Sequence, residues 1–205
     1  MTTLESNIEQ IDKSLTPTIA SIFARYSCRK YMDKPIPEDI LATIIECGRV
    51  APCGGNNQST KFYVISNRNV LDKLIRLTEQ EFAAMELTED LYKSLKNTIR
   101  LSKKGGYDFT YKAPVIIVLT NKKGYDNAMA DSVCANMSMM LAATSLNIGS
   151  CYLNQLHWLD NSKALREFLN IADDETICCS LCLGYPAQER LRAREITGNS
   201  VELIG

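Results

Sequence analysis

The chain has 205 residues, 45% of them hydrophobic and 23% charged, which is the ordinary composition of a protein that folds around a core. Its formal net charge is −1, so no basic field favours nucleic acid as a partner. No run of about 18 or more apolar residues occurs, and the first residues lack the basic and apolar regions of a signal peptide. We therefore expect one domain, residues 1–205, in the cytoplasm, with neither nucleic acid nor a membrane as a partner.

The N-terminal part contains an amphipathic helix followed by a basic segment, residues 25–29. Apolar residues recur at helical spacing over 8–23, and Thr16-Pro17 is expected to break or restart this helix. The basic segment reads Arg25-Tyr26-Ser27-Cys28-Arg29. Arginine carries a planar fork of donors that suits phosphate, so two arginines can converge on one anion if the segment turns. The alternative is a solvated helix end, where arginine complements the helix dipole.

A second helix and a glycine-rich loop come next. Pro35-Ile36-Pro37-Glu38-Asp39 predicts a turn into a helix, which ends at a loop over residues 51–58, called the glycine loop below. This loop has the sequence Ala-Pro-Cys-Gly-Gly-Asn-Asn-Gln and leads into a predicted strand, 61–66. Glycine lets backbone approach a ligand closely, and amide side chains can pair with a planar heterocycle. A plain connecting loop is the alternative.

The middle of the chain predicts two exposed helices, a buried strand and a long helix. Residues 69–104 show helical spacing with a break at 87–90, and they form either a lid over a pocket or a surface decoration. The apolar run 113–119 predicts a strand buried on both faces. Residues 127–146 predict the longest helix, with Gly149 as its C-terminal cap. Few charges follow Asp131, so this helix should be buried nearly all round, in part against a partner subunit.

The C-terminal part predicts an extended stretch, 150–155, a short helix, 162–169, and a second buried strand, 176–183. Cys179 and Cys182 form the only C-x-x-C among eight cysteines, and in a strand they face opposite sides. We therefore expect structural thiols there, without a metal or a disulfide.

Several catalytic and binding motifs are absent. His157 is the only histidine and lies among apolar residues, where a packing role is expected. No zinc-ligand spacing, no G-x-G-x-x-G and no P-loop occurs. If the protein is an enzyme, a bound cofactor is expected to carry its chemistry.

Four features in this order resemble the FMN-dependent nitroreductase family over nearly the whole chain. The basic segment is similar to the family's Arg-x-Ser-x-Arg/Lys opening, and the glycine loop is similar to its A-P-S-x-x-N-x-Q loop. The stretch 141–152 and Leu183-Gly184-Tyr185-Pro186 with spaced arginines complete the order. The resemblance implies an α+β fold, with helices around a central, mainly antiparallel sheet. It also implies an intertwined homodimer with FMN at the subunit interface.

The resemblance also implies a set of cofactor-binding residues. Arg25 and Ser27 would hold the FMN phosphate, and Arg29 would reach the N1/O2 edge of the ring, where its charge can stabilise the reduced form. The glycine loop would come from the other subunit, the backbone near residues 153–154 would face the flavin N5, and two late arginines would close on the phosphate. The full set is Arg25, Tyr26, Ser27, Arg29, Pro52, Cys53, Gly54, Asn56, Gln58, Leu153, Asn154, Arg192 and Arg194.

The chain departs from the family pattern in the glycine loop. Ser59-Thr60 stands where the family usually has Pro-Trp, and Cys53 replaces a serine. Neither change removes a backbone donor, so flavin binding is still expected, with a different pocket shape. Cys53 is either an inert thiol or a redox-sensitive one.

The implied function is an NAD(P)H-dependent FMN oxidoreductase of the nitroreductase type. Reducing equivalents would pass in a ping-pong cycle from NADH or NADPH through the flavin N5 to a nitroaromatic, a quinone or a similar electrophile. No catalytic side chain is assigned, because the chemistry takes place on FMN. One alternative is a flavin-binding redox sensor or storage protein without turnover. Another is a sister-branch enzyme that dehalogenates, fragments flavin or oxidises heterocycles. Residues 69–112 would recognise a dedicated substrate.

Overall fold

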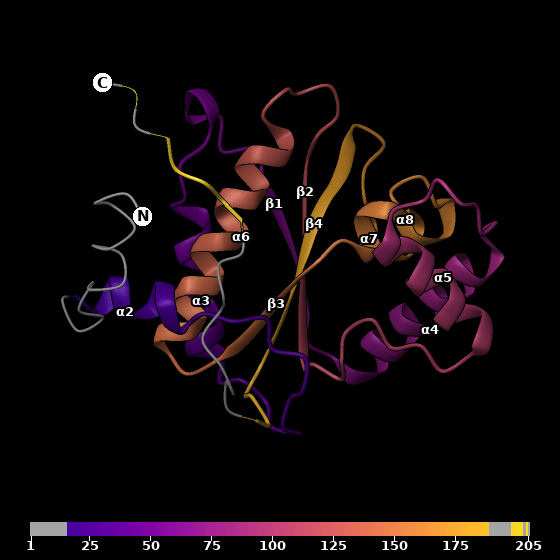
Figure 1. Cartoon of the computed structure of the whole chain (residues 1–205), viewed down its shortest axis with the longest axis horizontal. Helices are drawn as coiled ribbons and strands as arrows, with labels where there is room; N and C mark the ends of the chain where they lie inside the picture. The colour runs from indigo at the N-terminus through magenta and orange to yellow at the C-terminus, as the bar shows by residue number, and fades with distance from the viewer. Residues whose placement is uncertain (1–15, 189–197, 203, 205) are drawn as a thin grey trace.

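The computed structural model describes residues 16–188, 198–202 and 204, and these form an α+β fold around a four-stranded sheet (Figure 1). The strands lie in the order β1-β2-β4-β3, and every neighbouring pair is antiparallel. Their bounds are β1 Lys61–Ile65, β2 Val115–Lys122, β3 Gly149–Leu153 and β4 Glu175–Gly184. Seven of the eight residues of β2 and nine of the ten residues of β4 are buried, which confirms the two central strands predicted from their apolar runs.

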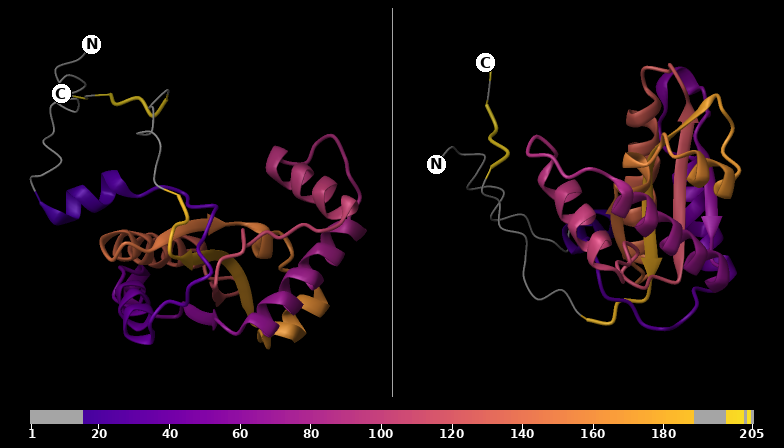
Figure 2. Two further views of the ribbon diagram at one scale, coloured as in Figure 1. Left: turned by 90° about the horizontal axis from the view of Figure 1, so that it is seen from below. Right: turned by 90° about the vertical axis from the view of Figure 1, so that its right-hand side faces the viewer.

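Helices cover both faces of the sheet. α3 (Glu38–Arg49) and α6 (Ala128–Ser145) lie on one face. α4 (Arg68–Ala84), α5 (Lys93–Lys104), α7 (Gln155–Trp158) and α8 (Lys163–Leu169) lie on the other, and the α4–α5 pair projects away from the sheet (Figure 2). The short α2 (Pro17–Ala24) packs near α6. The predicted break between α4 and α5, at residues 87–90, is confirmed.

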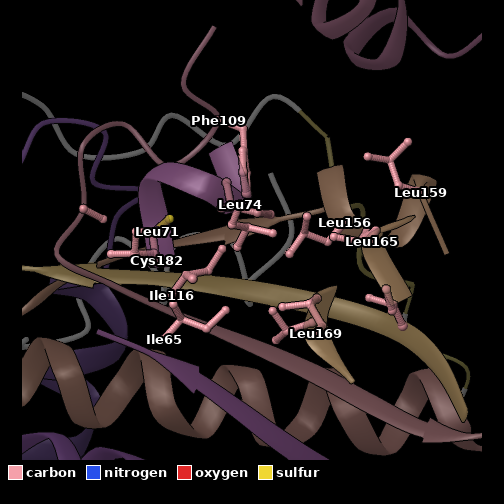
Figure 3. Close-up of a cluster of buried hydrophobic side chains, with 14 of the residues drawn as sticks. Ile65, Leu71, Leu74, Phe109, Ile116, Leu156, Leu159, Leu165, Leu169 and Cys182 are labelled. Atoms are coloured by element: carbon pink, nitrogen blue, oxygen red, sulfur yellow. The ribbon is translucent and has the colours of Figure 1, made fainter. Parts of the chain in front are cut away.

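Each face of the sheet has its own hydrophobic core. On the α3/α6 side, Ile117 and Leu181 pack with Met139 of α6. On the other side, Ile116 and Cys182 pack with Leu74 of α4, in the cluster drawn in Figure 3. The alternation of strand side chains between the two faces accounts for both cores.

A β-bulge in β4 changes which residues face which core. Leu119 pairs with Cys179 and Thr120 pairs with Ile177, so Cys178 is the extra residue. Cys179 and Cys182 belong to opposite cores, as predicted from their spacing, and both are free thiols in this structure. Burial raises the pKa of the Cys179 thiol to about 12, so this thiol stays protonated near neutral pH.

The start of α2 agrees with the prediction from the sequence, whereas the end of α6 does not. Thr16 caps α2 by accepting a hydrogen bond from the Ile19 amide (3.2 Å), so the predicted restart at Thr16-Pro17 is confirmed, while residues 1–15 lie outside the described part. The predicted cap of α6 was wrong. Asn147 takes the left-handed conformation (φ 57°), and the Ile148 amide donates to the Ala143 carbonyl at 2.8 Å. Gly149 is instead the first residue of β3.

Two absences hold within the described residues. None of their helices is long and apolar enough to cross a membrane. They also contain no group of three or more His, Cys, Asp or Glu side chains that could hold a metal ion. His157 is half-buried, and its Nδ1 lies 2.7 Å from the Ile177 carbonyl oxygen.

Candidate functional site

The basic segment lies extended beside β3. α2 ends at Ala24, and Arg25 turns the chain with φ −58° and ψ 130°. Ser27 forms a parallel bridge with Ser150, and the Cys28 amide donates to the Ser150 carbonyl at 2.8 Å. The segment is therefore docked on the sheet edge, and the alternative of a solvated helix end does not describe it.

The charges of both arginines in the basic segment reach the same part of β3. Burial raises the pKa of the Cys151 thiol, whereas Arg29 and then Arg25 act in the opposite direction. The Arg29 guanidinium also lies 5.9 Å from the centre of the Tyr111 ring. Burial raises the pKa of Tyr111, and a hydrogen bond with Arg29 partly opposes that effect. Both arginines therefore contribute positive charge near β3, which favours an anionic ligand there.

Polar atoms without a partner flank this edge. The Ser150 Oγ and the Gln155 Oε1 are buried and have no hydrogen-bond partner among the described residues. Gln155 uses its other amide atom, Nε2, to donate to the Tyr107 hydroxyl at 3.2 Å. Buried polar atoms are nearly always hydrogen-bonded in folded proteins, so these two atoms mark places where a ligand or water can bind.

The turn after β3 lies between the strand that carries Ser150 and the helix that carries Gln155. Leu153 is buried at the end of β3, and Asn154 starts α7 with φ −103° and ψ −6°. A cavity of about 190 Å³ adjoins the basic segment, with Tyr26, Gly149 and Ser150 in its lining. The Tyr26 hydroxyl itself donates to the Gln188 carbonyl at 3.0 Å. The structure thus brings the predicted residues 25–29 and 153–154 to the same strand, β3.

The glycine loop lies near the start of α6, where the Gly54 amide donates to Asp131. Gly54–Asn56 form a short 3₁₀ turn, η1, and Asn56 and Gln58 take left-handed conformations. Cys53 is half-buried, and its Sγ lies 3.4 Å from the Gln58 amide nitrogen as a hydrogen-bond acceptor. A cavity of about 390 Å³ opens here, and its lining includes Pro52, Cys53, Gln58 and Asp131.

The glycine loop and the basic segment lie at opposite ends of α6. This helix has 18 residues, which is roughly 27 Å at about 1.5 Å per residue. Asp131 in its first turn holds the glycine loop, whereas Thr144 near its last residue lines the cavity beside Tyr26. A single chain therefore does not bring together the two predicted halves of the site, which are the glycine loop and the basic segment beside β3. Arg192 and Arg194 lie outside the described residues, so their predicted role stays a prediction.

Four residues at these half-sites were missed from the sequence. Tyr107, Tyr111 and Gln155 carry no local pattern that marks them. Asp131 did carry a signal, because it is the only charged residue of α6, and a lone charge in an apolar helix needs a specific partner.

Comparison with known proteins identifies the family of the chain. Residues 22–185 match the sequence model of the nitroreductase family. A crystal structure of an FMN-bound nitroreductase from Bacteroides fragilis NCTC 9343 superposes with a TM-score of 0.82 at 28% identity, covering 93% of this chain and 100% of that chain.

Two relatives are similar to this chain in sequence. A protein of Archaeoglobus fulgidus, described as a candidate NADH dehydrogenase/NAD(P)H nitroreductase, is 28% identical over 173 residues, covering 82% of this chain and 85% of the relative. A 4-nitrobenzoate reductase of Nocardioides sp. is 26% identical over 216 residues, covering 89% of this chain and 86% of the relative. Because the family match spans most of its length, the chain belongs to the nitroreductase family.

Proposed function

We propose that the chain is a single-domain, FMN-dependent oxidoreductase that accepts reducing equivalents from NADH or NADPH and passes them to a small electrophile. A nitroaromatic compound or a quinone is the class of acceptor we propose. The observation that carries the proposal is the docking of the basic segment, with Arg25 and Arg29, on β3 at Ser150, whose buried hydroxyl has no hydrogen-bond partner among the described residues. The likeness to an FMN-bound nitroreductase at 28% identity supports the choice of cofactor.

The residues at the β3 edge fit a phosphate-bearing cofactor with a planar ring. Arg25 and Ser27 would bind the phosphate, since arginine forms charge-assisted hydrogen bonds with phosphate oxygens. Arg29 would place its charge where negative charge collects on reduction of the ring, and it is oriented by its contact with Tyr111. The backbone at residues 153–154 would orient the reacting face. FMN when bound supplies the hydride and electron chemistry, so no side chain has to act as acid or base.

The separation of the two half-sites supports a homodimer. Met129, Cys134 and Met137 of α6 are exposed along one side, and the neighbouring Val50 is 80% exposed. A two-fold axis across α6 would cover this apolar stripe with its own copy. The same axis would bring the glycine loop of one subunit toward the basic segment of the other. We therefore propose that each FMN site is completed by the partner subunit.

Two other functions use the same residues. A flavin-binding sensor or storage protein would bind FMN without turnover, and a sister-branch flavoenzyme would turn over a different substrate. The 4-nitrobenzoate reductase relative, at 26% identity, favours a nitroaromatic acid as the first acceptor to assay.

The test is FMN reconstitution of the purified protein followed by steady-state assays with NADH or NADPH and either 4-nitrobenzoate or a benzoquinone. The proposal predicts a yellow dimer that binds one FMN per chain and reduces an acceptor of at least one of these classes. Protein that remains colourless after reconstitution would overturn the proposal. Tight FMN binding without reduction by either nicotinamide would favour the sensor or storage protein.

A further inference from the structure

The glycine loop is fastened to the start of α6 by two side chains. The Gly54 amide donates to Asp131 Oδ1 at 3.0 Å. The Tyr125 hydroxyl lies 3.0 Å from Asp131 Oδ2 and 3.1 Å from the Gly54 carbonyl oxygen, so its proton is shared between two acceptors. Both backbone polar groups of Gly54 therefore bind residues more than 70 positions away in the chain, and its carbonyl also accepts from the Asn57 amide at 3.1 Å.

Asp131 is buried, so its role depends on the hydrogen bonds that its carboxylate makes. The residue is 6% exposed and is the only charged residue of α6. It lies in the first turn of the helix, where the partial positive charge of the helix N-terminus favours a carboxylate. An apolar helix face could be completed by an alanine there. Burying a carboxylate instead costs free energy that its hydrogen bonds with Gly54 and Tyr125 offset.

Gly54 approaches these side chains more closely than any other residue could. A Cβ atom at Gly54 would lie 2.5 Å from the Tyr125 hydroxyl oxygen and 2.4 Å from the Asn127 Nδ2. Both distances are too short for real carbon contacts, so the loop and the residues before α6 could not keep this arrangement with a side chain at position 54. The backbone of the loop is therefore packed closely against Tyr125 and the residues at the start of α6.

We propose that Asp131 and Tyr125 are positioning residues that hold the backbone of Cys53–Asn56 in place for an FMN bound mainly by the partner subunit. This inference rests on the proposed function. α6 carries both Asp131 at its start and the exposed apolar stripe that we assign to the subunit interface. The hydrogen bonds of Asp131 and Tyr125 with Gly54 would therefore fix the position and orientation of the glycine loop at the subunit interface, across which the loop would contact the cofactor.

The test compares three variants with the wild-type dimer. Asp131→Ala removes the acceptor of the Gly54 amide and is expected to raise the Kd for FMN about 10- to 100-fold, the range for a lost hydrogen bond to a charged group. Tyr125→Phe keeps the ring and removes the hydroxyl, and is expected to raise the Kd about tenfold. Asp131→Asn keeps an oxygen that can accept from Gly54, and is expected to restore the Kd to within about threefold of wild type.

A control variant and two further measurements separate positioning from general loss of structure. Asp126→Asn, an exposed aspartate five residues before Asp131, should leave the Kd unchanged. Amide exchange of residues 53–58 in the protein without FMN should become faster in Asp131→Ala but not in Asp126→Asn or Asp131→Asn, with the dimer intact by sedimentation. The visible circular dichroism of any FMN still bound should change in the alanine variant, because the loop frames the ring.

Unchanged exchange of the loop and unchanged FMN affinity in Asp131→Ala would overturn the inference. An Asp131→Asn variant as impaired as Asp131→Ala would also overturn it, because the hydrogen bond could then not be the cause. If wild-type protein does not bind FMN, the proposed function fails, and the exchange measurement alone decides whether Asp131 and Tyr125 hold the loop.

Discussion

The close contact between Gly149 and the basic segment makes Gly149→Ala an informative perturbation. A Cβ atom at residue 149 would lie 2.8 Å from the Cys28 Sγ and 2.9 Å from the Cys28 Cβ, against at least 3.4 Å in ordinary contacts. Cys28 is 1% exposed and its amide is bound to the Ser150 carbonyl at 2.8 Å, so it has little room to retreat. Overpacking of this kind typically costs about 1–3 kcal/mol. We therefore expect Gly149→Ala to lower the free energy of unfolding by about 2 kcal/mol.

Gly149→Ala should also disturb the basic segment, which we propose binds FMN. Moving Cys28 off β3 moves its neighbours Ser27 and Arg29, so the Kd for FMN should rise by about fivefold or more, which corresponds to roughly 1 kcal/mol. Urea unfolding gives the stability, and quenching of flavin fluorescence gives the affinity. Gly198→Ala is the matched control, since no atom lies within 4 Å of its added carbon, and it should change stability by less than about 0.5 kcal/mol. A similarly small effect of Gly149→Ala, with FMN affinity unchanged, would refute the docking of the basic segment on β3.

Three further predictions concern charged groups. Arg25→Ala should raise the Kd for FMN by about tenfold or more. Arg29→Ala should instead shift the midpoint potential of bound FMN more than its affinity. Equal losses of FMN affinity in both variants, at an unchanged potential, would contradict these separate roles of the two arginines. Glu175→Ala should lower the free energy of unfolding by about 2 kcal/mol in urea titrations, because the buried Thr120 hydroxyl donates to Glu175 at 2.7 Å and would lose its acceptor. Burial alone would raise the pKa of Glu175, but hydrogen bonds from groups including Lys61 and Thr120 outweigh it and lower the pKa below its usual 4.5. The ionised Glu175 therefore stabilises the fold above about pH 4.5, and this stabilisation is lost as pH falls through the lowered pKa. Because the glutamine side chain does not ionise, Glu175→Gln should lack this pH-dependent loss of stability during acid unfolding.

Most elements of the fold could be predicted from local patterns. The apolar runs of β2 and β4 indicate buried central strands, and the helical spacing of 69–104 gives both α4 and α5. Such patterns work because periodicity reports which face of each element is buried, without reference to the rest of the chain. The opposite facing of Cys179 and Cys182 follows from the same strand periodicity.

Features that depend on distant partners could not be predicted. The extended conformation of the basic segment comes from its pairing with Ser150, and the bulge at Cys178 appears only in the register of β4 with β2. Gly149 looked like a helix cap because glycine is favoured there, but Asn147 can take the left-handed conformation and Gly149 is needed for its approach to Cys28.

The candidate site was predictable only in part. The family resemblance grouped the basic segment with residues 153–154, and the structure places both at β3. The assignment of the glycine loop to the partner subunit remains a prediction, supported by its place at the far end of α6. Tyr111 and Gln155 were not found, because their roles depend on the long-range contacts with Arg29 and Tyr107.

We propose above that the chain binds FMN and cycles it between reduced and oxidised forms. Anaerobic titration of the FMN-loaded dimer with NADH and then with NADPH, followed by absorbance near 450 nm, tests it most directly. We expect stoichiometric bleaching by at least one nicotinamide within seconds, and return of the absorbance when 4-nitrobenzoate or a quinone is added. Flavin that stays oxidised with both nicotinamides, or that bleaches and is not reoxidised by either acceptor, would contradict it.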